Sequence, residues 1–267
     1  MSFENILYAK QDHVAIITLN RADNLNAFHD GMLGEWSAAI EDAKRDGDIR
    51  VVIITGAGRG FCSGMDVKSA LKDGSTGGMT PIAQRRTPLR YSVHQVPLAL
   101  RNLEKPYIAA INGAAVGAGM DMASMADIRI ASAQARFGMT YVKMGLAPGD
   151  GGCYYLPRIV GMQRALELIW TGRIFDAEEA LAIGYVLKVV PHERLMDATL
   201  ELSAQIAENA PIGVQLAKKL AYQAELLDVT RALDLSETAL SICRSTEDSL
   251  EGPMAFVEKR KPQFKGR

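Results

Sequence analysis

The sequence predicts an α/β protein whose first part is rich in strands and whose last part is helical. Two stretches, residues 51–66 and residues 107–121, run from an apolar strand through a glycine-rich loop into a helical pattern. Short apolar runs bounded by glycine or proline are typical of buried strands. Because helices follow strands, parallel pairing with right-handed crossovers is expected. The order of elements therefore predicts an α/β core followed by a helical C-terminal region.

The N-terminal part is expected to contain two strands and one helix. Apolar runs at residues 6–8 and 14–19 predict the strands, which join near residues 11–13. Asp30 is a suitable cap for the helix. Its apolar positions are Met32, Leu33, Trp36 and Ile40. The strand at residues 51–55 follows, which completes a strand–helix–strand unit.

The later part of the chain becomes progressively more helical. Residues 89–103 have helical periodicity that Pro97 interrupts, residues 127–131 predict a strand, and glycines and prolines punctuate residues 138–157. The remaining helices are expected at residues 163–171, 176–183, 192–209, 212–227, 230–245 and 249–261, with a short strand at residues 185–190. The composition of residues 73–88 predicts a loop, either a functional one or a plain surface insertion.

Composition limits the classes of function. With 267 residues, of which 48% are apolar, the chain can form one large domain, or a domain with an appended subdomain, around a sizeable core. A net charge of −1 gives no sign of nucleic-acid or acidic-membrane partners. Cys62, Cys153 and Cys243 lack metal-like spacing, and their odd number favours reduced thiols and a cytoplasmic setting. We find no signal peptide and no apolar run long enough to cross a bilayer.

The two glycine-rich turns are the first chemical signal. A strand that turns into a helix start leaves backbone N–H groups free at a positive dipole end, where an anion or an oxygen that becomes one can bind. Two such turns could aim two donors at one point, which is what an oxyanion needs. A tight turn that needs small residues only for packing is the alternative. Residues 56–60 match neither the Rossmann nor the P-loop pattern.

Several short motifs occur in order along the chain. They are Leu19-Asn20-Arg21 with Leu25-Asn26-Ala27, Gly60-Phe61-Cys62-Ser63-Gly64-Met65-Asp66, Lys105-Pro106-Tyr107-Ile108-Ala109-Ala110-Ile111-Asn112-Gly113, Ala126-Asp127, Phe137-Gly138, Pro148-Gly149-Asp150-Gly151-Gly152 and Ala255-Phe256-Val257-Glu258-Lys259-Arg260-Lys261. This set resembles the crotonase superfamily, the enoyl-CoA hydratase/isomerase family, over nearly the whole chain. The resemblance implies a crotonase-like spiral of ββα units with the acyl-CoA site in residues 1–195. It also implies a helical region, residues 196–267, that forms trimers or dimers of trimers and covers CoA.

The resemblance implies which groups bind the thioester. The backbone N–H groups of Met65 and Ala118 are the expected oxyanion hole; the family often has glycine at the second position, but alanine keeps the N–H. The expected substrate- and CoA-binding residues are Asn24, Leu25, Ala27, Gly64, Asp66 and Gly117, with Phe256 and Lys259 reaching CoA from a neighbouring subunit. Taken alone, Phe256 is more often a core residue and Lys259 a solvated charge. Arg85 and Arg86 could meet the phosphates or lie on the surface. Coenzyme A is part of the substrate, and no separate cofactor or metal is expected.

Three residues are the candidates for acid/base catalysis. Hydratases of the family carry glutamates at the positions of Asp121 and Tyr141, so both positions depart here. Asp121 keeps an acid, whereas Tyr141, with a reference pKa of ~10, can donate a proton but is a poor base at neutral pH. Asp150 is the third candidate, because dienoyl-CoA-isomerising relatives carry an aspartate near the same loop, offset by one residue. A turn or cap role is open for Asp150, and a dipole-favoured acid for Asp121.

These features predict an enzyme that hydrates or isomerises the double bond of an enoyl-CoA through a stabilised thioester enolate. Decarboxylation or C–C cleavage of an acyl-CoA is an alternative, because a tyrosine replaces a carboxylate at position 141. A non-catalytic acyl-CoA-binding protein is the third interpretation. Of the four histidines, His94 is the one whose segment is expected to border the pocket, with a purely structural role as the alternative.

Overall fold

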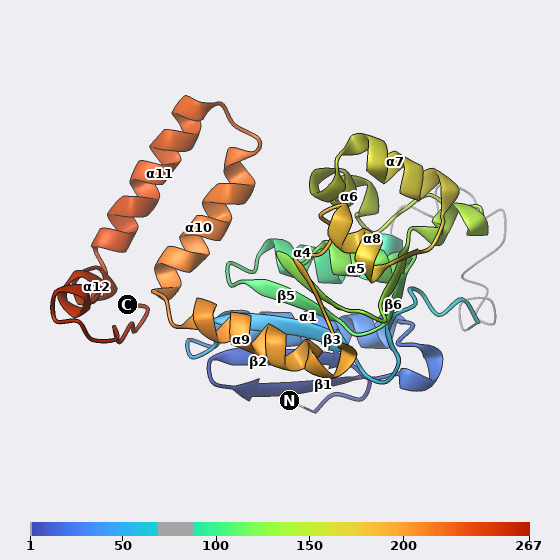
Figure 1. Cartoon of the computed structure of the whole chain (residues 1–267), viewed down its shortest axis with the longest axis horizontal. Coiled ribbons are helices and arrows are strands. Elements are labelled where there is room, and N and C mark those ends of the chain that lie inside the picture. Colours follow the sequence, from blue (N-terminus) through green and yellow to red (C-terminus); the bar gives the residue numbers. More distant parts are fainter. Residues whose placement is uncertain (1, 69–87) are drawn as a thin grey trace.

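The computed structural model describes residues 2–68 and 88–267. All but the last residue of the predicted loop at 73–88, including Arg85 and Arg86, lie outside the described residues. The strands form two sheets, one of six strands in the order β1-β2-β3-β5-β7-β10 and one of four in the order β4-β6-β8-β9 (Figure 1). The first sheet contains β1 (Ile6–Gln11), β2 (Val14–Leu19), β3 (Val51–Gly56), β5 (Tyr107–Ile111), β7 (Ile128–Ser132) and β10 (Lys188–Val190). The second contains β4 (Gly60–Cys62), β6 (Ala114–Val116), β8 (Arg136–Gly138) and β9 (Phe175–Asp176).

The six-stranded sheet is covered on both faces. β1 pairs antiparallel with β2, and the remaining pairs of this sheet are parallel. Alternate residues point to opposite faces: Val52 and Ile54 join the core cluster that contains α1 (Asp30–Arg45), whereas Val51 and Ile53 join the cluster that contains α9 (Leu195–Ala207). Strands buried on both faces have to be apolar throughout, which explains the continuous runs seen in the sequence.

Three consecutive strands of the large sheet each lead into a short strand of the small one. β3 leads to β4, β5 leads to β6 and then α5 (Ala118–Ser124), and β7 leads to β8 and then the 3₁₀ turn η3 (Thr140–Met144). β4, β6 and β8 are parallel. Buried amides hold the connections together: Asn26 Nδ2 donates to the Gly60 carbonyl at 2.8 Å and Asn112 Nδ2 to the Gly58 carbonyl at 2.9 Å. This repetition brings the glycine-rich turns to one side of the core.

The helices between the repeats and the C-terminus close the core. They are α3 (Pro88–Tyr91), α4 (Gln95–Arg101), α6 (Gly152–Val160), α7 (Met162–Thr171), α8 (Ala177–Ala182) and the 3₁₀ turns η1 (Ala22–Asn24) and η4 (His192–Arg194). Helix α6 begins inside the segment expected to be irregular, because its first residue belongs to a run of glycines that carries no helix signal. The strand expected at residues 185–190 is shorter, since the Tyr185 and Val186 amides bond to the Ala180 carbonyl in a turn.

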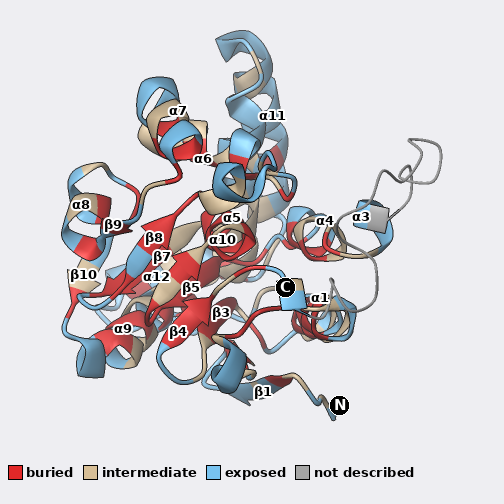
Figure 2. Cartoon of the chain, turned by 90° about the vertical axis from the view of Figure 1, so that its right-hand side faces the viewer, coloured by how far each residue is buried: buried red, intermediate tan, exposed pale blue. Residues whose placement is uncertain are grey.

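The last three helices form an arm beside the core: α10 (Pro211–Ala224), α11 (Val229–Arg244) and α12 (Asp248–Val257) (Figure 1). Helix α10 has no buried residue, and α11 has only Ala239, so these helices are mainly exposed (Figure 2 shows this for α11). Lys218 attaches α10 to the core through an ion pair with Asp127 at 2.7 Å. Within the described part of the chain, no helix has the length and apolar character needed to cross a membrane.

Candidate active site

In the loop after β4, the backbone amide of Met65 points away from the segment that pairs with it. Phe28 and Met65 form a parallel bridge in which the Phe28 amide bonds to the Gly64 carbonyl at 2.8 Å and the Asp66 amide to the Phe28 carbonyl at 2.9 Å. In such a bridge the flanking residues make the bonds, so the N–H of Met65 faces away from Phe28. Gly64 has φ of +91°, a conformation that favours glycine. The residue type at 64 therefore fixes the direction of the next amide.

The start of α5 presents the second amide. Ala118 is the first residue of that helix, so its N–H has no acceptor one turn earlier. A Cβ atom added to Gly64 would lie only 3.2 Å from both the Ala118 nitrogen and the Val116 carbonyl oxygen. A Cβ on Gly119 would collide with the carbonyl of Cys62. The two glycines therefore allow the loop of Met65 and the start of α5 to meet.

The segment predicted to bind CoA lies against this junction. Leu25 and Asn26 have φ of +50° and +56°, and the Ser63 amide donates to the Leu25 carbonyl at 3.0 Å. Arg21 pairs with Asp66 at 2.9 Å across the same contact. Asn24 and Leu25 therefore lie beside Gly64 and Asp66. Buried Ala27 follows in the same segment, and Gly117 directly precedes Ala118.

Phe256 and Lys259 do not join these residues within one chain. Both are exposed at the end of α12, which lies on the far side of the molecule from α5 and β6 (Figure 1). Phe256 has 84% of its surface exposed.

Asp121, Tyr141 and Asp150 meet in one cluster, which we call the acid trio. Asp121 comes from α5, Tyr141 from η3 and Asp150 from the loop before α6. The Tyr141 hydroxyl lies 2.7 Å from Asp121 Oδ2 and 2.9 Å from Asp150 Oδ2. Both aspartates are buried. The structure therefore brings together the three residues that the sequence picks out separately.

The acid trio binds protons more tightly than free aspartates do. A phenol has one proton, so it can donate to only one carboxylate at a time, and the second contact is a hydrogen bond only if that carboxyl is protonated. Burial raises the pKa of Asp121 to about 7, and the charge of Asp150 acts in the same direction, against the hydrogen bond from Tyr141. Burial also raises the pKa of Asp150. The pKa of Tyr141 rises through burial and the two carboxylates, so Tyr141 stays protonated.

The second oxygen of Asp121 has no hydrogen-bond partner in the described part of the chain. The backbone amides of Gly152 and Asp150 favour the ionised carboxylate but make no hydrogen bond to Oδ1. A Cβ on Gly152 would collide with this oxygen. An unsatisfied buried oxygen is costly in a finished structure, and it is what a proton-transferring carboxylate requires. Sequence patterns do not single out Gly152 beyond its place in a glycine run near Asp150.

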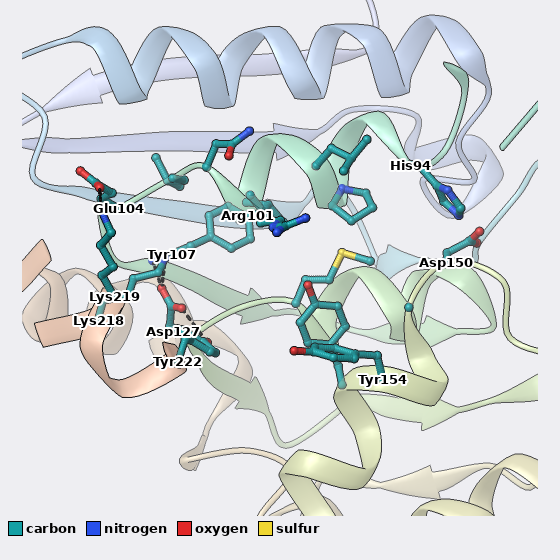
Figure 3. Close-up of a pocket in the computed structure, with 18 of the residues that line it drawn as sticks. His94, Arg101, Glu104, Tyr107, Asp127, Asp150, Tyr154, Lys218, Lys219 and Tyr222 are labelled. Atoms are coloured by element: carbon teal, nitrogen blue, oxygen red, sulfur yellow. Dashed lines mark hydrogen bonds and ion pairs between the residues drawn. The ribbon is translucent and has the colours of Figure 1, made fainter. Parts of the chain in front are cut away.

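A groove of about 1050 Å³ begins at Asp150 and runs along α4 toward α10 (Figure 3). Its wall includes Asp150 but not Asp121, Tyr141, Met65 or Ala118, so Asp150 is the one of these five residues that lines the groove. His94 borders the groove, as its position suggested, and its Nε2 lies 2.9 Å from the Gly149 carbonyl. The charge of His94 lowers the pKa of Asp150 against the larger effect of burial. Among described residues, no three His, Cys, Asp or Glu side chains gather closely enough to hold a metal ion.

Comparison with known proteins identifies the family of the chain. A family model described as enoyl-CoA hydratase/isomerase matches residues 9–267. A short-chain-enoyl-CoA hydratase of Clostridium acetobutylicum is 40% identical, with 100% of each chain covered. A 1,2-epoxyphenylacetyl-CoA isomerase of Escherichia coli is 36% identical, with 99% of each covered. The crystal structure of an enoyl-CoA hydratase from Bacillus anthracis superimposes with a TM-score of 0.92 at 36% identity, covering 99% of this chain and 100% of that one.

These matches span both the strand-rich core and the helical C-terminal region, so the predicted crotonase-like fold is confirmed. Relatives named as hydratases and as an isomerase match at similar identity, so the class of enzyme is established more firmly than the single reaction. The chain is therefore an enzyme of the enoyl-CoA hydratase/isomerase family, the crotonase superfamily.

Proposed function

We propose that this enzyme moves the double bond of an enoyl-CoA by a proton shift in which Asp121 both takes and returns the proton. The observation that supports this reaction is the acid trio. The Tyr141 hydroxyl contacts one oxygen of each buried carboxylate. The other oxygen of Asp121 has no partner among the described residues and is the one we assign to proton transfer. A shift of the double bond needs one such group, because the proton removed from one carbon is added to another.

In the proposed reaction, the amides of Met65 and Ala118 donate hydrogen bonds to the thioester carbonyl oxygen. Negative charge develops there when a proton leaves the α-carbon, and each donor contributes ~2.7–4 kcal/mol to transition-state stabilisation. Ionised Asp121 takes the α-proton of a 3-enoyl-CoA and becomes a neutral acid. The electrons of the broken C–H bond form a dienolate. Asp121 then delivers the proton to the γ-carbon, which gives the 2-enoyl-CoA and restores the carboxylate.

Tyr141 and Asp150 have supporting roles in this proposal. Tyr141 donates its hydrogen bond to whichever aspartate is ionised, so it can follow the proton without being deprotonated. Asp150 has the raised pKa that lets it share a proton with the trio. Because the CoA group arrives as part of the substrate, the proposal includes no separate cofactor. The free cysteines fit a cytoplasmic setting.

Hydration is the second candidate, and the names of two relatives favour it: short-chain-enoyl-CoA hydratase and crotonyl-CoA hydratase. Hydration requires a group that activates water and a group that protonates the α-carbon. Asp150 and Asp121 would have to divide these tasks. For that division Asp150 would bind the water through Oδ1, because its contact with Tyr141 uses Oδ2.

The two candidates are separated by supplying purified enzyme with 3-enoyl-CoA, 2-enoyl-CoA and 3,5-dienoyl-CoA in water enriched in ¹⁸O. Conversion of 3-enoyl- to 2-enoyl-CoA without ¹⁸O in the product supports the proton shift. Rapid formation of ¹⁸O-labelled 3-hydroxyacyl-CoA from the 2-enoyl thioester supports hydration instead. Turnover of none of them, together with release of carbon dioxide or an aldehyde from other acyl-CoAs, would replace both candidates by decarboxylation or C–C cleavage.

The proposal includes a homo-oligomer, a trimer or a dimer of trimers, in which residues 196–267 mediate contact and cover CoA. Its support is the apolar surface of the arm, where Leu226, Val229, Leu233 and Val257 are largely exposed. Phe256 and Lys259 would then approach CoA in a neighbouring chain. Light scattering and acyl-CoA affinity at varied protein concentration test this arrangement, and a monomer with unchanged affinity would contradict it.

A further inference from the structure

One face of α4 forms a wall of the groove along its length. His94, just before α4, and Pro97, Leu98 and Arg101 line it at the spacing i, i+3, i+4 and i+7, and Leu100 of the same helix also contributes. Side chains at this spacing lie on the same face of a helix. At 1.5 Å per residue, the seven steps from His94 to Arg101 extend ~10 Å. The groove therefore leads from the acid trio, at Asp150 and His94, to Arg101, whose backbone lies ~10 Å further along α4.

The wall changes character along this path. Beside Asp150 the lining includes Pro97, Leu98, Met125 and Tyr154, which suit an apolar chain. The other end is lined by charged groups: Glu104 and Asp127 from loops, Lys218 and Lys219 from α10 (Figure 3), and Lys44 from the end of α1. A ligand that fits both parts has an apolar body and a polar or charged end.

Arg101 differs from the other charged groups at that end. Lys218 pairs with Asp127 at 2.7 Å, Lys219 with Glu104 at 3.1 Å and Lys44 with Glu41 at 3.7 Å. For Arg101 there is no ion pair or hydrogen bond to any residue that the structure describes. The charge of Arg101 lowers the pKa of Tyr155, against the larger increase that burial causes. Figure 3 shows Arg101 between the Asp127 group and Asp150, within the groove.

We propose that Arg101 binds the far carboxylate of an acyl-CoA whose acyl chain ends in an acid group. A guanidinium matches a carboxylate with two parallel hydrogen bonds, and it is the cation best suited to this contact. A distance of ~10 Å corresponds to an extended chain of about six to eight carbon–carbon bonds. The substrate class is therefore a medium-chain, ω-carboxylated enoyl-CoA. This inference rests on the proposed function, because it assigns the acyl group of the same site.

Binding of unreactive thioesters tests the inference independently of catalysis. We expect the protein to bind suberyl-CoA, which has eight acyl carbons and a terminal carboxylate, more tightly than octanoyl-CoA by about 10- to 100-fold, the range of a hydrogen-bonded charge pair. Calorimetric titration measures both dissociation constants. Arg101→Gln should remove the difference, and Arg101→Lys should retain part of it, because lysine keeps the charge but not the paired hydrogen bonds.

Arg45→Gln is the matched control. Like Arg101, Arg45 is exposed and lies in the last turn of a helix, but it does not line the groove. It should leave the preference for suberyl-CoA unchanged. Equal binding of the two thioesters by the wild-type protein, or a preference that survives in Arg101→Gln, would overturn the inference. A preference without turnover of any enoyl-CoA would support the inference and contradict the proposed function. Turnover of enoyl-CoAs without the preference would contradict the inference and leave the proposed function standing.

Discussion

The core and the C-terminal arm use apolar residues in opposite ways. In the core, β3 and β5 bury nearly every side chain, and α1 buries the face that contains Trp36. In the arm, α10 buries none, and large side chains such as Leu226 and Phe256 remain exposed. Both regions have helical or strand periodicity that the sequence reveals. The difference shows that an amphipathic pattern predicts an element reliably, whereas it does not tell whether the cover for its apolar face comes from the same chain.

This contrast has a consequence for function. The acid trio and the loops that carry Met65 and Ala118 are fixed by the core, where a small displacement has no room to relax. The arm contacts the core mainly through ion pairs and side-chain hydrogen bonds, such as those of Lys218 and Tyr222 with Asp127. Substitutions at the core site should therefore change the rate by orders of magnitude, and substitutions at arm contacts should change stability slightly.

The largest effect is expected for Asp121→Asn. The amide keeps the shape of the side chain but can neither take nor return a proton, so kcat for the double-bond shift should fall by ~10²–10⁴-fold. Steady-state kinetics with a 3-enoyl-CoA measures this loss. Binding of a saturated acyl-CoA should stay within a factor of about three, which shows that the site is intact. Retention of more than about a tenth of the wild-type kcat would remove Asp121 from its proposed role.

A comparable loss is expected for Ala118→Pro, which deletes one N–H at the first position of α5. Proline is tolerated at that position of a helix because the amide has no partner in the helix. The predicted decrease in kcat is ~10²–10³-fold. Circular dichroism and the melting temperature serve as the control for folding. If a folded variant keeps its activity, the amide of Ala118 does not contribute to the reaction.

Sequence patterns revealed most of the large sheet and the helices, because continuous apolar runs and helical spacing reflect burial directly. The sequence does not predict β4, β6, β8 and β9, because strands of two or three residues carry too little periodicity. The approach of Gly152 to Asp121 and the position of Arg101 in the groove depend on contacts between distant segments, which no local pattern encodes. The family resemblance identifies the three residues of the acid trio one by one. It does not predict that the single hydroxyl of Tyr141 contacts both aspartates.

A smaller effect on rate, with a diagnostic shift in the pH midpoint of kcat/KM, is expected for Tyr141→Phe. In the wild-type enzyme the base form of Asp121 should appear as pH rises through about 7, so kcat/KM for the proton shift should increase with pH up to that region and then level off. The hydrogen bond from Tyr141 lowers the pKa of Asp121, so its loss should move this midpoint to higher pH and reduce the rate about tenfold at neutral pH. A midpoint that stays in place, or moves down, would show that Tyr141 does not stabilise the ionised aspartate.

The same group predicts how stability varies with pH. The folded-state pKa of Asp121 lies above the unfolded value, so the neutral carboxyl favours folding below the unfolded pKa of ~4. That contribution is lost as pH rises through about 7, at up to ~1.4 kcal/mol per pH unit. Urea unfolding at pH 5, 6 and 7 should therefore show a steeper loss of stability in the wild type than in Asp121→Asn. Parallel curves for the two proteins would mean that Asp121 keeps an ordinary pKa in the fold.

The smallest effect is expected where the arm contacts the core through exposed charges. Glu225 follows α10 and pairs with Arg158 of α6 at 3.2 Å, with more than a third of each side chain exposed. Solvent screens such a pair, so Glu225→Gln should lower the free energy of unfolding by no more than ~1 kcal/mol and leave kcat/KM for a 3-enoyl-CoA within a factor of about two. Urea unfolding and steady-state kinetics, run beside Asp121→Asn, give the comparison directly. A destabilisation above ~3 kcal/mol would mean that α10 belongs to the core of the single chain. The boundary between the core and the arm would then lie after α10.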